Sequence, residues 1–459
     1  MRRMMLIGVM AGGLLAGEGA AQLAAAQEWP VQDRTLANGL TVLFLEDRQT
    51  PLVTVQVWYR VGSRNEQPGL TGLSHVTEHM MFNGTATRGP NVFSTLVQKA
   101  GGRHNAFTTS DYTVYFETLA PQGLDLALGL EADRMANLVI DAKEFGLERN
   151  VVLEERRLRT DDNPSELLNE EVTATAFKAH PYQWPVIGWT PDLQAMTAED
   201  VRRYYQTYYA PNNAFLVIAG HPGEGSVFDR VERYFGHLPR RDGPPAVRGR
   251  EPAPQGERRV VLRREAELAH LVIGYQVPNH QSEDAFPLDV LSAVLGEGRS
   301  SRLYRRLVYS EQKALAVRSD YTPFTVDPHL LSVTAQVTAG VTPEELERLI
   351  AEEIERARRE NVSPAELARA KRRLEARFIL RQDSLFYRAL AVGQAEMLGG
   401  WALVREYLPR LRAVTAEQVR QAAERYLTEE RRTVGVLYPT PGRGRGGRPA
   451  GRPTGGEFR

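Results

Sequence analysis

Residues 196–208 read MTAEDVRRYYQTY, and residues 414–426 read VTAEQVRQAAERY. The two segments are 218 residues apart (414 minus 196), and each has the spacing of apolar positions that predicts an amphipathic helix. Each is followed by an apolar segment with the composition of a β-strand, residues 214–219 in the first copy and 433–437 in the second. The pair suggests that one helix-strand unit occurs twice in the chain.

The same offset relates a third pair of positions, because it takes Glu148 to Glu366, and each lies in a segment with helical composition. A shared offset favours duplication over coincidence, so we predict two homologous halves. Between the copies, residues 240–257 read RRDGPPAVRGREPAPQGE, and the four prolines and three glycines of this segment favour a linker. The predicted domains are a first half at 27–240, a linker at 241–257 and a second half at 258–440.

Both halves combine strands and helices in a segregated rather than alternating order. We therefore predict an α+β fold in which each half is of the α/β-roll type, with helices packed on a mixed or antiparallel sheet. With 42% hydrophobic and 25% charged residues among 459, the chain can bury sizeable cores. The predicted strands are residues 40–45, 53–61, 112–119, 259–263, 270–276 and 329–337.

The first half contains the pentapeptide HVTEH at residues 75–79. On a helix, His75 and His79 are one turn apart and project from the same face, so both imidazoles can reach one ion. Glu78 is about one turn from His75, so its carboxylate can lie over the ion without binding it, which is where a general base belongs. The pentapeptide therefore indicates hydrolytic zinc chemistry.

A catalytic zinc site needs a third protein ligand and one open position. The segment ERNVVLEERR, which begins at Glu148, is predicted to be helical and places Glu155 seven residues later on the same face. We expect Val151, Val152 and Leu158 to anchor the helix near that face. Glu155 is thus a candidate ligand, although a charged helical residue can equally belong to a solvated face.

These residues carry a resemblance. The order His75-x-x-Glu78-His79, followed by Glu155, resembles the inverted zinc motif of the insulinase/pitrilysin metallopeptidases, in particular their processing-peptidase-like branch. The resemblance extends from about residue 30 to about residue 440. It is carried by the segments LSHVTEHMMFNGT (73–85), NAFTTSDYT (105–113), ERNVVLEE (148–155) and YYAPNN (208–213).

The resemblance implies a zinc-dependent endopeptidase that hydrolyses peptides or unfolded protein segments. His75, His79 and Glu155 would bind one zinc ion per chain, and Glu78 would activate the water. Glu148 matches a second acidic position of the family, which is expected to support the site without binding the metal. A non-catalytic structural or peptide-binding subunit is the alternative, because the family's fold also occurs without catalysis.

The resemblance also places Asn105 and Ala106 in an edge strand that pairs with the substrate backbone. Residues 105–116 have the composition of a strand, although Asn105 also suits a turn at the start of one. The two halves are expected to close over a chamber that holds an unfolded peptide. The second half would be the facing wall, because the 218-residue offset takes the three predicted ligands to Ala293, Glu297 and Arg373.

The chain departs from the family at one position of its second half. Active members of this branch carry an Arg and a Tyr there, after a Ser-Ser-Arg-Leu-like segment, and this pair contacts the substrate and stabilises the tetrahedral intermediate. This chain has SSRLY at residues 300–304, but Tyr309 or Ser310 stands at the position of the Arg and Val317 at that of the Tyr. Because an oxyanion stabiliser contributes roughly 10²- to 10³-fold in rate, its loss would weaken the site severely.

We therefore predict a heterodimer in which a related chain supplies the Arg/Tyr pair. A homodimer remains possible, because Tyr304, Tyr309 or Arg318 can substitute locally. The 57 Lys and Arg residues balance the 57 Asp and Glu residues, so the net charge indicates no nucleic-acid partner.

The N-terminus predicts export. Residues 1–26 have two arginines, an apolar run of about 13 residues and a final Ala-Ala-Ala, which is typical of a signal peptide cleaved after Ala26. The chain has no cysteine, hence no disulfide and no lipid anchor on cysteine. We expect a periplasmic or secreted protein without a stable membrane anchor, with a retained signal anchor as the alternative.

Two further segments carry weaker predictions. Residues 441–459 are rich in Gly, Arg and Pro and lack apolar anchors, which predicts disorder, with an RNA-binding tail as the alternative. His180-Pro-Tyr182 follows a predicted helix and is interpreted as a surface turn, although it can also reach the cleft.

Overall fold

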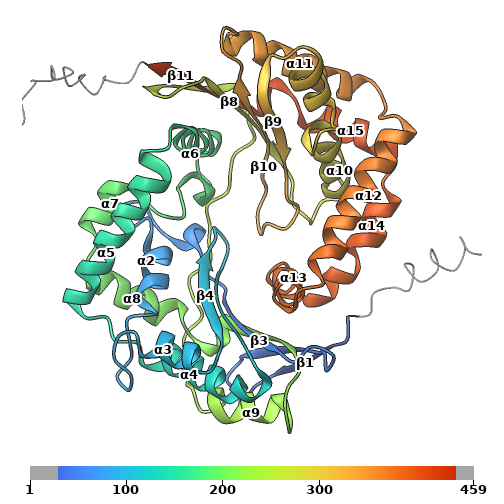
Figure 1. The fold of residues 1–459 in the computed structure, drawn as a ribbon. Coiled ribbons are helices and arrows are strands. Elements are labelled where there is room, and N and C mark those ends of the chain that lie inside the picture. The colour runs from blue at the N-terminus through green and yellow to red at the C-terminus, as the bar shows by residue number, and fades with distance from the viewer. Residues whose placement is uncertain (1–28, 441–459) are drawn as a thin grey trace, which may run out of the picture.

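The computed structural model of the chain describes residues 29–440 (Figure 1). The predicted signal peptide and the predicted C-terminal tail lie outside the described residues. The described chain forms two mixed β-sheets, each with helices packed on it, so the α+β prediction is confirmed. None of the helices within residues 29–440 has both the length and the apolar character that a bilayer span needs.

The first sheet has the strand order β1-β2-β6-β3-β5-β4, which leaves β4 at one edge. Its strands are β1 Val31–Thr35, β2 Thr41–Glu46, β3 Val53–Tyr59, β4 Arg103–Thr108, β5 Thr113–Leu119 and β6 Ala214–Gly220. The helices of this half are α2 Leu73–Met80, α3 Val92–Lys99, α4 Leu124–Asn137, α5 Ala142–Arg156, α6 Pro164–Ala176, α7 Thr190–Ala195, α8 Ala198–Tyr208 and α9 Val227–Phe235. A short π-helix, η3 Arg157–Asp161, continues α5.

The second sheet has the strand order β7-β11-β8-β10-β9. Its strands are β7 Arg258–Glu265, β8 His270–Val277, β9 Ala314–Asp320, β10 His329–Val337 and β11 Arg432–Thr440. The helices of this half are α10 Ala285–Gly296, the π-helix η6 Tyr304–Ser310, α11 Pro343–Arg359, α12 Pro364–Arg381, α13 Leu385–Met397, α14 Tyr407–Ala413 and α15 Ala416–Tyr426.

The two halves share one topology, as the repeat in the sequence predicts. The order β2-β6-β3-β5-β4 of the first sheet is matched element by element by β7-β11-β8-β10-β9 of the second. In each sheet the first of these pairs is parallel and the next is antiparallel. The repeated helices α8 and α15 begin after Thr197 and Thr415, and both threonines form a capping box with the residue three positions on.

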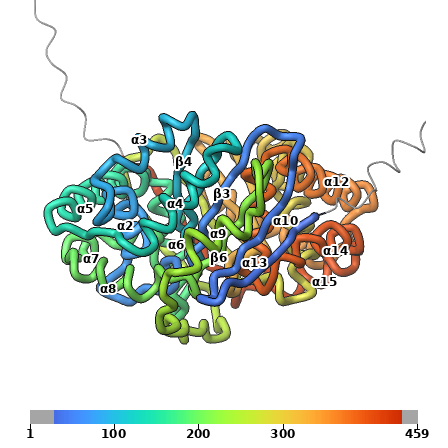
Figure 2. Tube along the Cα trace, turned by 90° about the horizontal axis from the view of Figure 1, so that it is seen from below, coloured from blue at the N-terminus to red at the C-terminus, as the bar shows by residue number. Residues whose placement is uncertain are grey.

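The halves exchange one helix each. Helix α6 of the first half packs on the second sheet, where Val172 lies against Val272 and Leu437. Helix α13 of the second half packs on the first sheet, where Ala389 and Val392 lie against Trp58. In the perpendicular view of Figure 2, α13 lies beside β6 of the first sheet.

Two glycines permit this close packing. A Cβ atom on Gly393 of α13 would lie 2.2 Å from the Trp58 ring, and one on Gly435 of β11 would lie 2.2 Å from a methyl group of Val172. Both distances are far below van der Waals contact, so each position requires glycine. The exchange therefore joins the two sheets through well-packed apolar contacts rather than through a loose hinge.

Two local predictions need correction. The stretch 105–116 is not one strand, because residues 109–112 form a turn that joins β4 to β5. The segment 180–182 is not a surface turn, because His180 is 4% exposed and Tyr182 2%. It lies between the halves, where the Tyr182 hydroxyl donates to Asp111 and His180 Nε2 lies 3.1 Å from Asp327 of the second half.

Candidate metal centre

Helix α2 carries the pentapeptide and is fixed at its first turn by a buried carboxylate. Glu66 accepts hydrogen bonds of 2.7 Å from the backbone N–H groups of Gly72 and Ser74. These donors have no partner within a helix, so Glu66 acts as its cap. Burial raises the pKa of Glu66 to about 8. Gly72 has φ +91°, and a Cβ there would lie 2.7 Å from the Ile187 carbonyl oxygen, which explains the glycine.

The helix buries one face and leaves the histidines on the other. Leu73, Val76 and Met80 are at most 4% exposed and belong to the core of the first half. The side chains of His75 and His79 are 12% and 21% exposed, and their ring centroids are 4.8 Å apart. The helical spacing therefore places both imidazoles side by side, as the sequence predicts.

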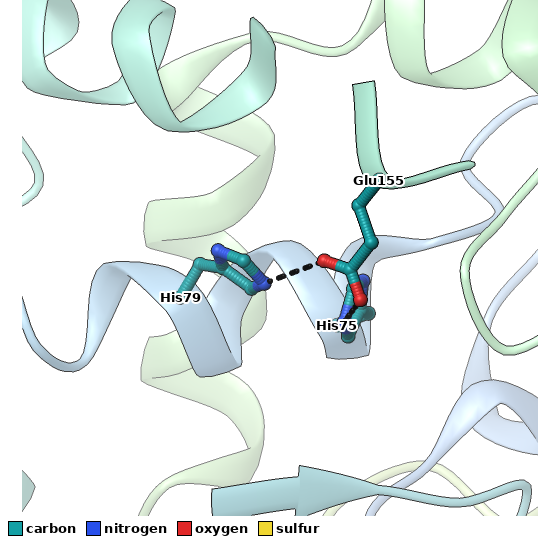
Figure 3. Close-up of side chains that lie close together, drawn as sticks. All are labelled: His75, His79 and Glu155. Atoms are coloured by element: carbon teal, nitrogen blue, oxygen red, sulfur yellow. Dashed lines mark ion pairs between the residues drawn. The ribbon is translucent and has the colours of Figure 1, made fainter. Parts of the chain in front are cut away.

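Helix α5 brings two carboxylates to the same place, as Figure 3 shows for Glu155. Glu155 Oε2 lies 3.4 Å from His79 Nε2, and Glu155 Oε1 lies 3.9 Å from His75 Nε2. Glu148 Oε2 forms a hydrogen bond of 3.2 Å with His79 Nδ1. The two residues lie on one face of α5, as their separation of seven positions predicts.

The three predicted ligands have the composition and spacing of a zinc site. One ligand atom from each of His75, His79 and Glu155 lies within 4.8 Å of the other two. Zinc bonds of about 2.0–2.2 Å place tetrahedral ligand atoms roughly 3.3–3.6 Å apart, so small side-chain adjustments suffice. Two imidazoles and one carboxylate with a fourth position open are the ligand set of several catalytic zinc sites.

The surroundings of the two histidines differ. Burial lowers the pKa of His75 to about 4, and its Nδ1 has no hydrogen-bond partner within the described residues. For His79, burial lowers the pKa, but the hydrogen bonds with Glu148 and Glu155 outweigh it and raise the pKa to about 9. Because a ligating imidazole must be neutral, metal binding near pH 7 would displace a proton from His79.

Glu78 is hydrogen-bonded to the edge strand and is not one of the three clustered ligands. It is 9% exposed, and its Oε2 accepts a hydrogen bond of 2.5 Å from the hydroxyl of Thr108, the last residue of β4. Burial raises the pKa of Glu78, and the hydrogen bond from Thr108 opposes that shift. A carboxylate of this kind, beside the ligands but not among them, is suited to proton transfer.

The apolar neighbours of Glu155 differ from the prediction. Val152 is fully buried and anchors α5, but Val151 is 50% exposed and Leu158 62% exposed. The prediction for these two is wrong, because only one side of α5 faces the core. Glu155 also forms an ion pair with Arg159, a residue of η3 that the sequence does not single out.

The two predicted substrate-binding residues lie on the edge strand β4. Asn105 is exposed, whereas Ala106 is 9% exposed and packs in the core of the first half. Since β5 pairs with only one side of β4, the other side keeps backbone groups available to an added strand.

Comparison with known proteins agrees with these features. Residues 41–189 match the family described as insulinase (peptidase family M16), and residues 195–374 match the family described as the peptidase M16 inactive domain. The chain is 34% identical over 355 residues to the zinc protease PqqE of Helicobacter pylori, which covers 76% of this chain and 80% of that protein. This chain belongs to the M16 family.

Other relatives extend over most of the chain. It is 30% identical over 432 residues to an uncharacterized zinc protease of Mycobacterium leprae, covering 92% of this chain and 95% of that protein. The crystal structure of a Helicobacter pylori protease superposes with a TM-score of 0.86 at 30% identity, covering 89% of this chain and 99% of that one. The periplasmic protease PqqL of Escherichia coli shares the fold, with a TM-score of 0.74 at 18% identity over 90% of this chain and 48% of that one.

Within residues 258–440, all of which the structure describes, the second half has no equivalent group of metal-ligating residues, although the corresponding residues also meet. One small cavity is lined by Ala293, Glu297, Glu366 and Arg373, which lie 218 positions after His75, His79, Glu148 and Glu155. Here the Arg373 guanidinium of α12 donates to the carbonyl oxygen of Glu297 in the segment after α10. An arginine thus links these two helices, and the ligand set is absent at these positions, in agreement with the match to an inactive domain.

Three residues that shape the site escape sequence reasoning: Glu66, Thr108 and Arg159. Thr108 shares one face of β4 with Ala106, as the period of two in a strand requires. The sequence, however, carries no sign that this face lies against α2. Glu66 precedes its helix by seven residues, which is outside the usual spacing of a capping residue.

Proposed function

We propose that this chain is a zinc-dependent endopeptidase that hydrolyses peptides or unfolded protein segments. The observation that carries the proposal is the convergence of His75, His79 and Glu155 from two helices, with ligand atoms within 4.8 Å of one another. Two comparisons support it. The chain is similar to proteins named zinc proteases, and its first half matches the insulinase family of peptidases.

The residues of the chain divide the work in the proposed reaction. His75, His79 and Glu155 would hold one zinc ion, and Glu148 would orient His79 through Nδ1. When bound, zinc supplies Lewis-acid polarisation of the scissile carbonyl group and makes water more acidic. Glu78 takes a proton from the attacking water and returns it to the leaving amine.

The edge strand β4 provides a place for the substrate. An extended peptide that adds to its unpaired side would form main-chain hydrogen bonds at alternate residues of the segment that holds Asn105 and Ala106, beside the helix that carries the ligands. Main-chain pairing requires an extended segment, so unfolded chains are favoured over folded domains. We further propose that the two halves enclose a chamber that holds the peptide. The proposed first half ends at residue 240, the linker at residue 257 and the second half at residue 440.

The test is a comparison of zinc content with hydrolysis. Purified chain should contain about one zinc ion, and Glu78→Gln should keep the metal while hydrolysis of an unfolded protein, measured with the partner chain present where wild type alone is inactive, falls by roughly 10²- to 10⁴-fold. Native protein that binds no zinc, or Glu78→Gln with wild-type activity, would contradict the proposal. Such a result would favour the non-catalytic peptide-binding subunit.

We also propose that a related chain completes the active site. Two of the three candidate replacements for the Arg/Tyr pair are exposed, since Tyr309 is 78% exposed and the side chain of Arg318 is 68% exposed and pairs with Asp320. The third, Tyr304, is partly buried against the core of the second half. Val317 is buried in the core of the second half. Full activity of the purified chain without any partner would rule out the heterodimer and support a homodimer or a monomer.

Export is the last part of the proposal. A signal peptide at residues 1–26 would direct the chain to the periplasm or the medium, and cleavage after Ala26 leaves Gln27 as the first residue. N-terminal sequencing of the protein from cell fractions tests this. A protein that retains Met1 in the membrane fraction would indicate the signal anchor instead.

A further inference from the structure

The carboxylate of Glu78 is held by a hydroxyl from a different element. Thr108 Oγ1 donates to Glu78 Oε2 at 2.5 Å, across the contact between β4 and α2. A carboxylate with one oxygen held in this way rotates less freely, so the other oxygen has a narrower range of directions in which to accept a proton. Proton transfer is sensitive to such geometry, because donor and acceptor must lie within hydrogen-bond distance.

Thr108 is itself firmly placed at the end of its strand. It pairs with Thr113 in the β4–β5 register, and the Thr113 hydroxyl lies 3.5 Å from that of Thr108. Thr113 in turn donates to the carbonyl oxygen of Val61 at 2.9 Å. The end of β4 is therefore fixed against the centre of the sheet.

The turn after Thr108 is bound to the second half. Within the turn, the Thr109 hydroxyl accepts from the backbone N–H groups of Asp111 and Tyr112. The Asp111 carboxylate is 7% exposed and accepts from the Tyr182 hydroxyl at 2.6 Å and from the backbone N–H of Val326 at 3.1 Å. Val326 belongs to the second half, so the half without a metal site fixes a turn that begins one residue after Thr108.

We propose that Thr108 is a positioning residue for Glu78, and that the second half maintains this position through the backbone N–H groups of Val326 and Asp327, which donate to Asp111 and Tyr182 of the first half. The inference rests on the proposed peptidase function and gives the metal-free half a part in it. Thr108 acts on the carboxylate that transfers the proton. It has no predicted contact with the metal or the substrate backbone.

The first test compares Thr108→Val, Thr108→Ser and the control Thr118→Val. Thr118 lies on β5 and donates to Thr54, so the control removes a similar hydroxyl away from α2. Loss of a hydrogen bond to a charged group should lower kcat for Thr108→Val by about 10- to 100-fold. KM and zinc content should stay within about twofold of wild type, and Thr108→Ser should recover most of kcat.

The outcomes separate positioning from structure and from the proposed function. Unchanged kcat in Thr108→Val, an equal loss in Thr118→Val, or no recovery in Thr108→Ser would overturn the inference. If wild type hydrolyses peptides and Glu78→Gln does not, such a result leaves the peptidase proposal intact. If zinc-loaded wild type fails to hydrolyse any unfolded substrate, with or without a partner chain, both fall.

The second test concerns Tyr182, a residue of the first half whose hydroxyl donates to Asp111 and accepts from the backbone N–H of Asp327 in the second half. Tyr182→Phe removes the hydroxyl that Asp111 accepts from and should lower kcat by about three- to tenfold with zinc content unchanged. If this effect passes through Thr108, the double variant with Thr108→Val should be little slower than Thr108→Val alone. If the loss of kcat in the double variant instead equals the product of the two single-variant losses, the two residues act independently. That result would overturn the role of the second half.

Discussion

Replacement of Glu148 tests whether a residue outside the ligand set controls zinc affinity. Its Oε2 holds His79 Nδ1 at 3.2 Å, and this hydrogen bond lowers the pKa of Glu148. Partners of this kind typically contribute 10- to 100-fold in metal affinity. The side chain of Glu148 is 24% exposed, so solvent screens part of its charge. Glu148→Gln retains an acceptor but loses the charge, so we expect about a tenfold loss, or about 1.4 kcal/mol.

The assay is competition for zinc with a chelator of known affinity at fixed pH and ionic strength. Glu148→Ala removes acceptor and charge together and should lose about 100-fold. The matched control is Glu154→Gln, the same charge change on the same helix, because Glu154 is 64% exposed and pairs with Arg157 instead. If Glu148→Gln binds zinc within twofold of wild type, or no more weakly than the control, the assigned role of Glu148 is refuted.

Two further predictions concern stability. Burial raises the pKa of the Asp289 carboxyl group to about 6, above its value in the unfolded chain. The folded state therefore binds this proton more tightly than the unfolded state does. The resulting stabilisation of the fold is complete below about pH 4 and is lost as the pH rises through 6. In denaturant titrations, the stability of Asp289→Asn relative to wild type should therefore be greater at about pH 7.5 than at about pH 4.5. An equal difference at the two pH values would contradict this. Gly393→Ala should lower the free energy of unfolding by about 1–3 kcal/mol, because the added Cβ meets Trp58. The control Gly146→Ala in α5 adds a Cβ that meets nothing within 4 Å and should raise the free energy of unfolding by about 0.5–1 kcal/mol. Equal denaturation midpoints for the two variants would refute the packing argument.

Much of the fold follows from the sequence because it is encoded locally. The apolar strands and the repeated helix can be recognised from periods of two and 3.6 residues, and the constant offset relates them without any knowledge of packing. The same is true of His75 and His79, which are neighbours by helical geometry alone. A pattern of apolar residues does not, however, show which protein surface covers them. The helix exchange of α6 and α13 was therefore not predictable, since an apolar helix face does not specify the sheet on which it packs.

Burial was the least predictable property of individual residues. Val151 and Leu158 are apolar but exposed, because α5 has only one side against the core. Tyr182 has the neighbours of a turn residue but is buried, because the second half covers it. In both cases the deciding contact lies far away in the sequence.

The sequence by itself determined the duplication, the α+β class and the pairing of His75 with His79, because spacing along helices and strands fixes these features; Glu155 was a candidate ligand that only the packing of α5 on α2 brings to the two histidines. Only the tertiary structure decided which strand lies at the edge of the sheet, that Thr108 holds Glu78, and that an arginine links α12 to the end of α10 in the second half. The physical reason is that a hydrogen bond between distant residues depends on strand register and helix packing, which no local pattern specifies.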